Sequence, residues 1–170
     1  ESIDQSDVGE MFGEILIKGD NVFLEYLDQP ELTEKKKKDG WFYSGDLGYL
    51  KGGELFVLDR KDNMILVGGE NVYPLEIERH LPLLDGIVEG VVTSRPHQIL
   101  VSELVLVYEL KESIEVNIPM WKKTLATLIS NFKIPSVFID AATLKTEGIP
   151  RASNGKILRK KLYDLVNENI

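Results

Sequence analysis

Short apolar runs separated by polar turns divide the first 60 residues into segments of strand length. Residues 14–18 form one such run, and residues 41–50 and 54–59 form two more, joined by the turn sequence Lys51-Gly52-Gly53-Glu54. Apolar runs of this length, bounded by glycine and polar residues, are typical of strands. We therefore expect a β-rich segment whose last two strands form a hairpin.

A helix is predicted between the first strand and the hairpin. Asp28 is followed by Pro30 and Glu31, an Asp-x-x-Glu capping box with a proline in the first turn, and Gly40 is a plausible stop. The lysine run at residues 35–38 would then lie at the end of this helix, where cations complement the helix dipole. We favour this interpretation over a nucleic-acid or membrane patch.

Beyond residue 61 the pattern alternates between strands and helices. Apolar runs at residues 64–67, 86–93, 103–110 and 137–139 are of strand length. Helices are expected at residues 75–81, after Pro119, and at the C-terminus. The apolar stripe of the second helix is predicted to be Leu125, Leu128, Ile129 and Phe132, and that of the last helix Leu158, Leu162, Leu165 and Val166. The order predicts an α+β domain with a three-stranded sheet and flanking helices.

The short charged segment at residues 60–63 separates the hairpin from the first strand of this α+β domain. We place the domain boundary there. Residues 1–61 are predicted to be the β-rich tail of a larger N-terminal domain, and residues 62–170 a small C-terminal domain.

Composition narrows the function classes. The 170 residues are 43% hydrophobic and 28% charged, as in ordinary globular domains. The net charge of −8 argues against nucleic acid as the main partner. There is no cysteine, which excludes disulfides and thiolate metal sites, and His80 and His97 stand in no metal-ligand spacing. We expect no metal site in this chain, no membrane span, and a cytoplasmic setting.

Two positions at the ends of the hairpin form a first candidate site. Asp46 follows an aromatic-rich strand and Arg60 closes the next one, so the hairpin brings them together. A carboxylate that accepts from vicinal hydroxyls, beside an arginine that donates, suits a ribose diol. A plain surface ion pair is the commoner arrangement for such residues taken alone.

A second candidate is Lys156, in the turn sequence Ser153-Asn154-Gly155-Lys156. Its basic sequence neighbours, with no acid among them, predict a local positive pocket: Arg151, Arg159, Lys160 and Lys161. The alternative is a solvated basic face at the start of a helix. The string is not a phosphate-binding P-loop, because Pro150 replaces the first glycine and Ile157 replaces the serine or threonine.

Three strings of this sequence resemble, in order and spacing, successive motifs of the adenylate-forming enzymes. They are YSGDLG at residues 43–48, LDRKDNMILVGGENVYPLEIE at residues 58–78 and PRASNGKILRKKL at residues 150–162. That superfamily contains acyl-CoA synthetases, the adenylation domains of peptide synthetases and beetle luciferases. The resemblance runs from about Gly13 to Leu162. It departs mildly at Ser44, where threonine is frequent, and at Asp59, where glycine is commoner.

The resemblance implies roles for several residues. Lys156 corresponds to the catalytic lysine that bridges the carboxylate substrate and ATP, and residues 62–170 to a mobile lid. Asp46 and Arg60 would hold the nucleotide ribose. The loop Gly68-Gly69-Glu70 would line the pantetheine tunnel for thioester formation, where missing side chains let a thiol chain pass. The hinge of the lid would be Asp62.

The resemblance also implies that much of the enzyme is absent from this sequence. The phosphate-gripping loop, the acyl pocket and the acidic Mg²⁺ ligand of the superfamily are not found, so the chain alone is not expected to be active. The leading interpretation is the C-terminal part of an ATP-dependent fatty-acyl or aryl-CoA ligase, with ATP, CoA and a small carboxylic acid as partners and Mg²⁺ held by the missing part.

Two alternatives stay open. The first is an adenylation domain of a peptide synthetase or an acyl-carrier ligase, which would transfer the acyl group to a phosphopantetheine carrier protein. The second belongs to another class: a stand-alone interaction module that binds an acidic partner through the lysine run at residues 35–38 and the basic cluster around Lys156. Sequence upstream of Glu1 that contains a phosphate loop would favour the enzyme.

Overall fold

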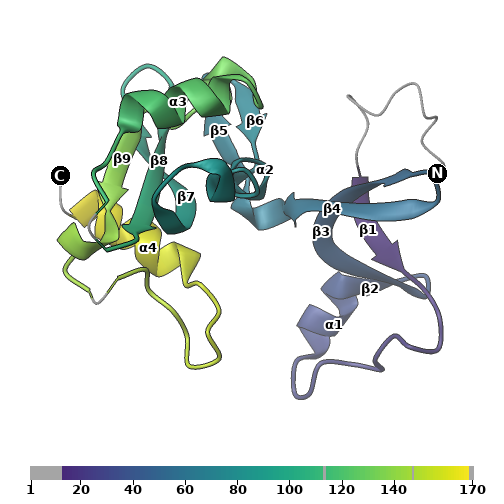
Figure 1. Cartoon of the computed structure of the whole chain (residues 1–170). Helices are drawn as coiled ribbons and strands as arrows, with labels where there is room; N and C mark the ends of the chain where they lie inside the picture. The colour runs from purple at the N-terminus through teal and green to yellow at the C-terminus, as the bar shows by residue number, and fades with distance from the viewer. Residues whose placement is uncertain (1–12, 113, 147, 169–170) are drawn as a thin grey trace. The chain divides into compact units, whose positions relative to one another are not determined.

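The chain divides between Asn63 and Met64 into two units, each with its own sheet (Figure 1). The computed structural model describes residues 13–112, 114–146 and 148–168. The predicted boundary, between residues 61 and 62, lies two residues before this division.

The first unit contains a four-stranded antiparallel sheet organised around one long strand, β3 (Trp41–Lys51). Strands β1 (Gly13–Ile17), β2 (Lys37–Lys38) and β4 (Glu54–Arg60) all pair with β3. The predicted hairpin is confirmed. Its turn residues Gly52 and Gly53 have φ values of 60° and 84°, the left-handed pair that suits a two-residue hairpin turn.

The predicted cap of the first helix is wrong. Helix α1 (Pro30–Lys36) begins after Gln29, and Asp28 has a left-handed φ of 56° outside the helix. Thr33 holds the entry instead, because its hydroxyl accepts a hydrogen bond from Tyr26 N (2.9 Å) and donates one to Gln29 O (3.0 Å). The helix therefore starts one residue later than a cap at Asp28 requires.

The same helix ends earlier than the predicted stop at Gly40. Asp39 and Gly40 have φ values of 52° and 78°, so they form a two-residue turn that joins β2 to β3. The lysine run is thereby divided between two elements. Lys35 and Lys36 lie in the last turn of α1, as the dipole argument predicts, and the next two lysines form β2.

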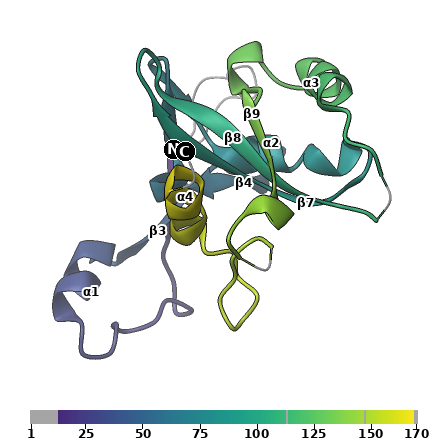
Figure 2. The ribbon, with the colours of Figure 1, turned by 90° about the vertical axis from the view of Figure 1, so that its left-hand side faces the viewer.

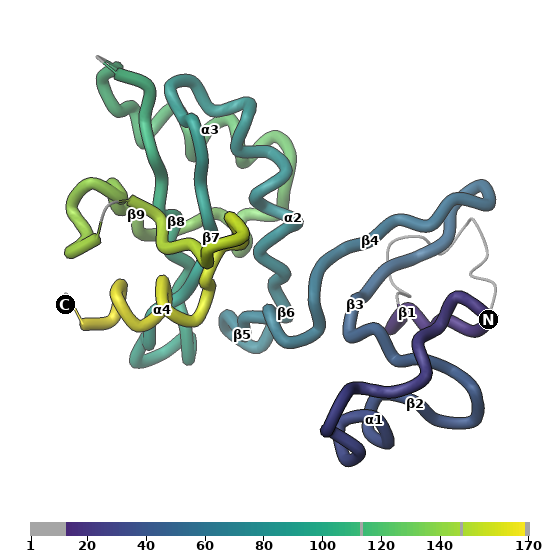
Figure 3. The backbone as a smooth tube through the Cα atoms, turned by 90° about the horizontal axis from the view of Figure 1, so that it is seen from below, coloured from purple at the N-terminus to yellow at the C-terminus, as the bar shows by residue number. Residues whose placement is uncertain are grey.

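The second unit is built on a five-stranded sheet (Figure 3). Its central strand, β8 (Val101–Leu110), pairs along its whole length with β7 (Ile87–His97). On the other side β8 pairs with the parallel strand β9 (Val137–Asp140), and at Val101 with β5 (Ile65–Val67), which continues to β6 (Glu70–Val72). The α+β class is confirmed.

The sheet has five strands, where three were predicted. The apolar run at residues 64–67 joins the sheet as β5, and the turn that follows it adds β6. Gly68 and Gly69 have φ values of 58° and 92°. Such a pair of left-handed glycines returns the chain directly into an antiparallel strand. These glycines therefore join β5 directly to β6.

Helices cover both faces of this sheet (Figures 1 and 2). Helices α2 (Pro74–Glu78) and α3 (Ile118–Ala126) pack against one face, and α4 (Arg159–Glu168) packs against the other. Alternate residues of β8 supply the two cores, as expected for a strand buried on both faces. Leu104, Leu106 and Tyr108 enter the first core, and Val105 and Val107 enter the second.

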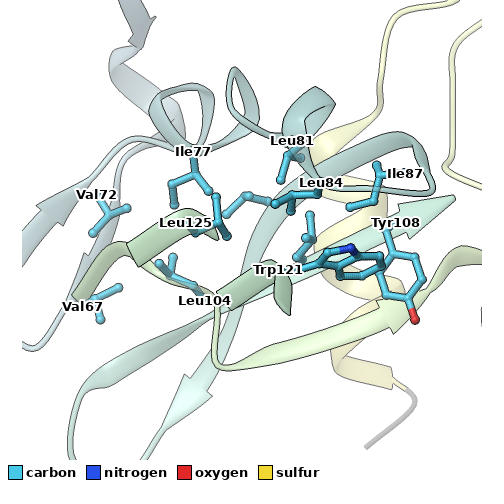
Figure 4. Packing of buried hydrophobic residues seen from close by; sticks show 12 residues of the cluster. Val67, Val72, Ile77, Leu81, Leu84, Ile87, Leu104, Tyr108, Trp121 and Leu125 are labelled. Atoms are coloured by element: carbon cyan, nitrogen blue, oxygen red, sulfur yellow. The ribbon is translucent and has the colours of Figure 1, made fainter. Parts of the chain in front are cut away.

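Trp121 is the centre of the first core, and the stripe predicted for its helix is partly wrong (Figure 4). The Trp121 ring is 2% exposed, meets the Tyr108 ring edge-on at 5.1 Å, and donates from Nε1 to Asp85 O at 3.0 Å. Leu125 is buried as predicted, whereas Leu128 and Phe132 are 41% and 43% exposed. The helix ends at Ala126, so helical spacing does not extend to them.

The predicted stripe of the last helix is confirmed at Leu162 and Val166, which are fully buried. Leu158 is 37% exposed because α4 begins only at Arg159. Leu165 is partly exposed.

We predict that Trp121→Ala lowers the free energy of unfolding by about 3–5 kcal/mol, because it removes the largest side chain of a packed core. Urea unfolding followed by circular dichroism measures the change. Leu128→Ala, two residues beyond the end of the same helix, is the matched control and should cost less than about 1 kcal/mol. Similar losses for both variants would contradict the assignment of Trp121 as the core residue.

Candidate functional site

The predicted pair at the ends of the hairpin is brought together. Asp46 and Arg60 are directly opposite each other on β3 and β4, with Asp46 Oδ1 3.2 Å from Arg60 Nη1. Ser44 fixes the backbone here, since its hydroxyl donates to Ile15 O (2.8 Å) and accepts from Asp46 N (3.0 Å). The two charged side chains are 35% and 50% exposed, so both remain accessible to a ligand. One contact leaves most of the five N–H donors of an arginine available.

Asp59 has a role that sequence reasoning missed. It is 3% exposed, and its Oδ1 accepts from Arg60 N (2.6 Å) and from Asn63 Nδ2 (2.7 Å). The carboxylate thus ties the end of β4 to the 3-10 helix Lys61–Asn63, which contains the exposed candidate hinge Asp62. Short polar side chains such as aspartate often accept hydrogen bonds from nearby backbone N–H groups at turns. The aspartate directly before Arg60 was therefore the sequence signal that could have predicted this role.

The loop at Gly68 is anchored on one side and open on the other. Gly68 N donates to Leu100 O at 2.9 Å, in the connection between β7 and β8. That connection is itself shaped by His97, whose Nδ1 accepts from the backbone N of Ile99 and Leu100. A methyl group on Gly69 would meet nothing within 4 Å, and the neighbouring Glu70 is exposed. The backbone of this turn is therefore approachable from solvent.

Lys156 lies in a tight hairpin of its own. Arg151 and Ile157 form an isolated antiparallel bridge, and Ala152 N donates to Lys156 O at 2.8 Å. Asn154 Oδ1 accepts from Lys156 N at 3.1 Å, which stabilises the turn. The Lys156 side chain is exposed, and no hydrogen bond or ion pair of its ammonium occurs among the described residues. The hairpin presents a cation that is free to meet an anion.

The positive pocket predicted around Lys156 is smaller than its sequence neighbours suggest. Arg151 Nη2 donates to both carboxylate oxygens of Glu89 in β7, and Arg151 Nη1 donates to Gly155 O at 2.6 Å. The hydrogen bond and charge of Glu89 raise the pKa of Arg151 above its ordinary value. Acids that are distant in sequence neutralise this position, so the expectation of a pocket without acids is wrong.

The second arginine of the predicted pocket is also paired. Arg159 donates to both oxygens of Glu78, at 2.8 and 2.6 Å, and Glu78 Oε1 also accepts from Val92 N at 2.8 Å. The side chain of Glu78 is only 10% exposed, and that of Arg159 29%. Arg151 and Arg159 thus fasten the two ends of the Lys156 hairpin to β7 and α2, and they are positioning groups more than free charges.

The two candidate loops of the second unit belong to opposite edges of its sheet. The strand order is β6-β5-β8-β7, with the Gly68-Gly69 turn at the first edge. The Lys156 hairpin is tied to β7, at the other edge, through Arg151 and Glu89. Lys156 and the glycine turn therefore do not form one cluster within this unit.

No model of a protein family matches the chain, although individual known proteins resemble it. It is 36% identical over 160 residues to a 2-succinylbenzoate–CoA ligase of Geobacillus sp. (strain WCH70), covering 92% of this chain and 31% of that protein. The structure of o-succinylbenzoate CoA synthetase from Bacillus subtilis, in complex with its acyl-adenylate intermediate, aligns with a TM-score of 0.81 at 30% identity. That alignment covers 90% of this chain and 30% of the synthetase.

The relatives of this chain include CoA ligases of the AMP-forming superfamily. Another of its relatives, the long-chain-fatty-acid–CoA ligase of Bacillus subtilis (strain 168), is 31% identical over 158 residues. The chain spans 31% and 27% of the lengths of these two relatives, so it matches less than a third of each ligase. Among the residues described, no helix has the length and apolar character needed to cross a membrane.

We predict that Glu78→Ala lowers the free energy of unfolding by about 3 kcal/mol, because it removes a largely buried carboxylate that accepts hydrogen bonds from Arg159 and from Val92 N. Chemical denaturation measures this loss. Glu115→Ala, which removes the same group from an exposed position, is the control and should change stability by less than about 0.5 kcal/mol. Equal stability of the two variants would show that the Glu78–Arg159 pair does not hold the hairpin.

Proposed function

We propose that the chain is the C-terminal part of an ATP-dependent carboxylic acid:CoA ligase, which forms an acyl-adenylate and then an acyl-CoA thioester. The observation that carries the proposal is the similarity to a CoA ligase over 92% of the chain. The acid belongs to the aryl or fatty-acyl class, since the relatives are named for 2-succinylbenzoate and long-chain fatty acids. The cysteine-free sequence favours a cytoplasmic setting.

In the first half-reaction, Lys156 stabilises charge while the carboxylate attacks the α-phosphate of ATP. A cation that is exposed at the rim of a clamped hairpin is suited to this work, because its position is set before the charge develops. Asp46 accepts hydrogen bonds from the ribose hydroxyls and Arg60 donates beside it. Mg²⁺ would be held by the part of the enzyme outside this sequence, as would the phosphate loop and the acyl pocket.

In the second half-reaction, the turn Gly68-Gly69-Glu70 faces the thiol arm of CoA. Its open backbone lets a narrow chain pass close to the turn. This turn and Lys156 belong to opposite edges of one sheet, so the lid must rotate to bring each to the same substrate. We assign the hinge to Asp62, which is exposed and lies next to the division between the units.

The contacts favour this enzyme over a module that binds an acidic partner. Lys37, in the middle of the lysine run, donates to Phe23 O and Leu24 O at 2.7 and 2.8 Å, so it serves the fold of the first unit. Arg151 and Arg159 are paired with acids. Each basic cluster therefore has fewer cations available to a partner than its sequence suggests.

Lys156→Ala in the full-length enzyme should slow adenylate formation by a factor on the order of 10²–10³, because it removes a cation matched to developing charge. Thioester formation from preformed acyl-adenylate should be largely spared. Pyrophosphate exchange and single-turnover thioesterification measure the two steps separately, and Lys160→Ala on the exposed start of α4 is the control. Equal losses in both steps would refute the role of Lys156.

Asp62→Pro in the full-length enzyme should leave adenylate formation within several-fold of normal, while thioester formation falls far more. Proline fixes φ near about −65° and so restrains rotation about this residue. Asp62→Ala, which removes the carboxylate but leaves φ free, should retain both steps. If the two half-reactions fall together, or if alanine acts like proline, the hinge lies elsewhere.

A further inference from the structure

Lys36 is directed at the residue that precedes Asp46. A methyl group placed on the Cα of Gly45 would lie 3.2 Å from Lys36 Nζ and 3.1 Å from Arg60 Nη2. The ammonium and the guanidinium therefore converge on one point, in the space left by the missing side chain of a buried glycine. Lys36 reaches this point from the last turn of α1, whereas Arg60 reaches it from the end of β4.

The acids around this point already have partners. Asp46 pairs with Arg60 at 3.2 Å. Glu14 accepts from Gly45 N at 3.1 Å through one oxygen and from Lys61 Nζ at 3.3 Å through the other. No hydrogen bond or ion pair of the Lys36 ammonium occurs among the described residues, although its side chain is half-buried. Among the residues that the structure describes, three cations thus face two carboxylates here.

Two like charges that converge on one point repel each other, and burial strengthens the repulsion. A lysine in the last turn of a helix gains only a little free energy from its interaction with the helix dipole. It would gain as much with its side chain extended into solvent. An anion between the two groups turns the repulsion into two charge-assisted hydrogen bonds. Arginine offers a planar fork and lysine a point charge, and both are used for phosphate oxygens.

We propose that Lys36 and Arg60 form a phosphate-binding cradle over Gly45, which takes a phosphate of the nucleotide whose ribose hydroxyls Asp46 binds. The ribose part of this statement rests on the proposed function. The cradle itself rests on the convergence of the two cations. Lys36 thereby contributes to the affinity for the nucleotide, whereas the other lysines of the run at residues 35–38 do not.

The test is a titration of the 170-residue chain with adenosine, AMP and inorganic phosphate, followed by NMR at the backbone amide of Gly45. Wild-type chain should bind AMP more tightly than adenosine, and added NaCl should reduce the difference. Lys36→Met, which keeps the aliphatic stem, should weaken AMP binding by about tenfold and leave adenosine binding unchanged. Lys36→Arg should restore AMP binding, and Lys35→Met, with the same charge change on the same helix, should bind AMP like the wild type.

Several results would overturn the cradle. They are an unchanged AMP affinity in Lys36→Met, equal losses for AMP and adenosine, equal effects of Lys35→Met and Lys36→Met, or a Gly45 amide that responds to neither AMP nor phosphate in the wild type. Asp46→Asn tests the ribose assignment separately. If it leaves adenosine binding unchanged while Lys36→Met still weakens AMP and phosphate, the cradle stands and the ribose role of Asp46 falls.

Discussion

Strand β8 is the element on which the second unit depends, because it is hydrogen-bonded along both edges and packed on both faces. Its successive residues alternate between two cores, one built with Trp121 and one with Leu162 and Val166. Most of the apolar surface that this unit buries lies against β8 or its neighbour β7. Burial on both faces leaves these strands little freedom to shift register, since a slip by one residue would exchange the two cores. The outer loops of this unit are therefore attached to a sheet that has little freedom to rearrange.

The Lys156 hairpin is held in place by contacts with this sheet and with a helix that packs on it. It has little apolar surface of its own, and its position depends on two arginines that reach acids on β7 and α2. Ion pairs of this kind orient the side chains as well as stabilise the fold, because an arginine that contacts both oxygens of a carboxylate fixes the orientation of both groups. The pairing also neutralises the arginines. The exposed Lys156 thereby lies beside charges that are already paired, as its proposed role in adenylate formation requires.

In the first unit the charged groups around Gly45 are not fully paired with one another. Around Gly45, in the part of the chain that the structure describes, the carboxylates already have partners and the cations outnumber them. The local excess of positive charge opposes the net charge of −8 carried by the chain as a whole. Such an excess is costly unless an anion is bound for part of the working cycle. The glycine at this position is required twice, by its φ of 80° and by the two cations that occupy the space of a side chain.

Much of this protein follows from the sequence alone. The strands are predictable because their apolar runs and glycine turns are local signals, and the motif strings locate Asp46, Arg60, Gly68 and Lys156 without any coordinates. Helix limits were less accurate, because the Asp39-Gly40 turn outcompeted the continuation of α1, and α3 stopped before Leu128.

What only the tertiary structure decided is which charges meet. Arg151 and Glu89 are 62 residues apart, Arg159 and Glu78 are 81 apart, and Lys36 meets Arg60 across two different elements. An ion pair depends on distance through space, and no local pattern in the sequence records which distant segments the sheet will bring together. A run of basic residues can therefore be identified from the sequence, but its free charge is determined by the fold.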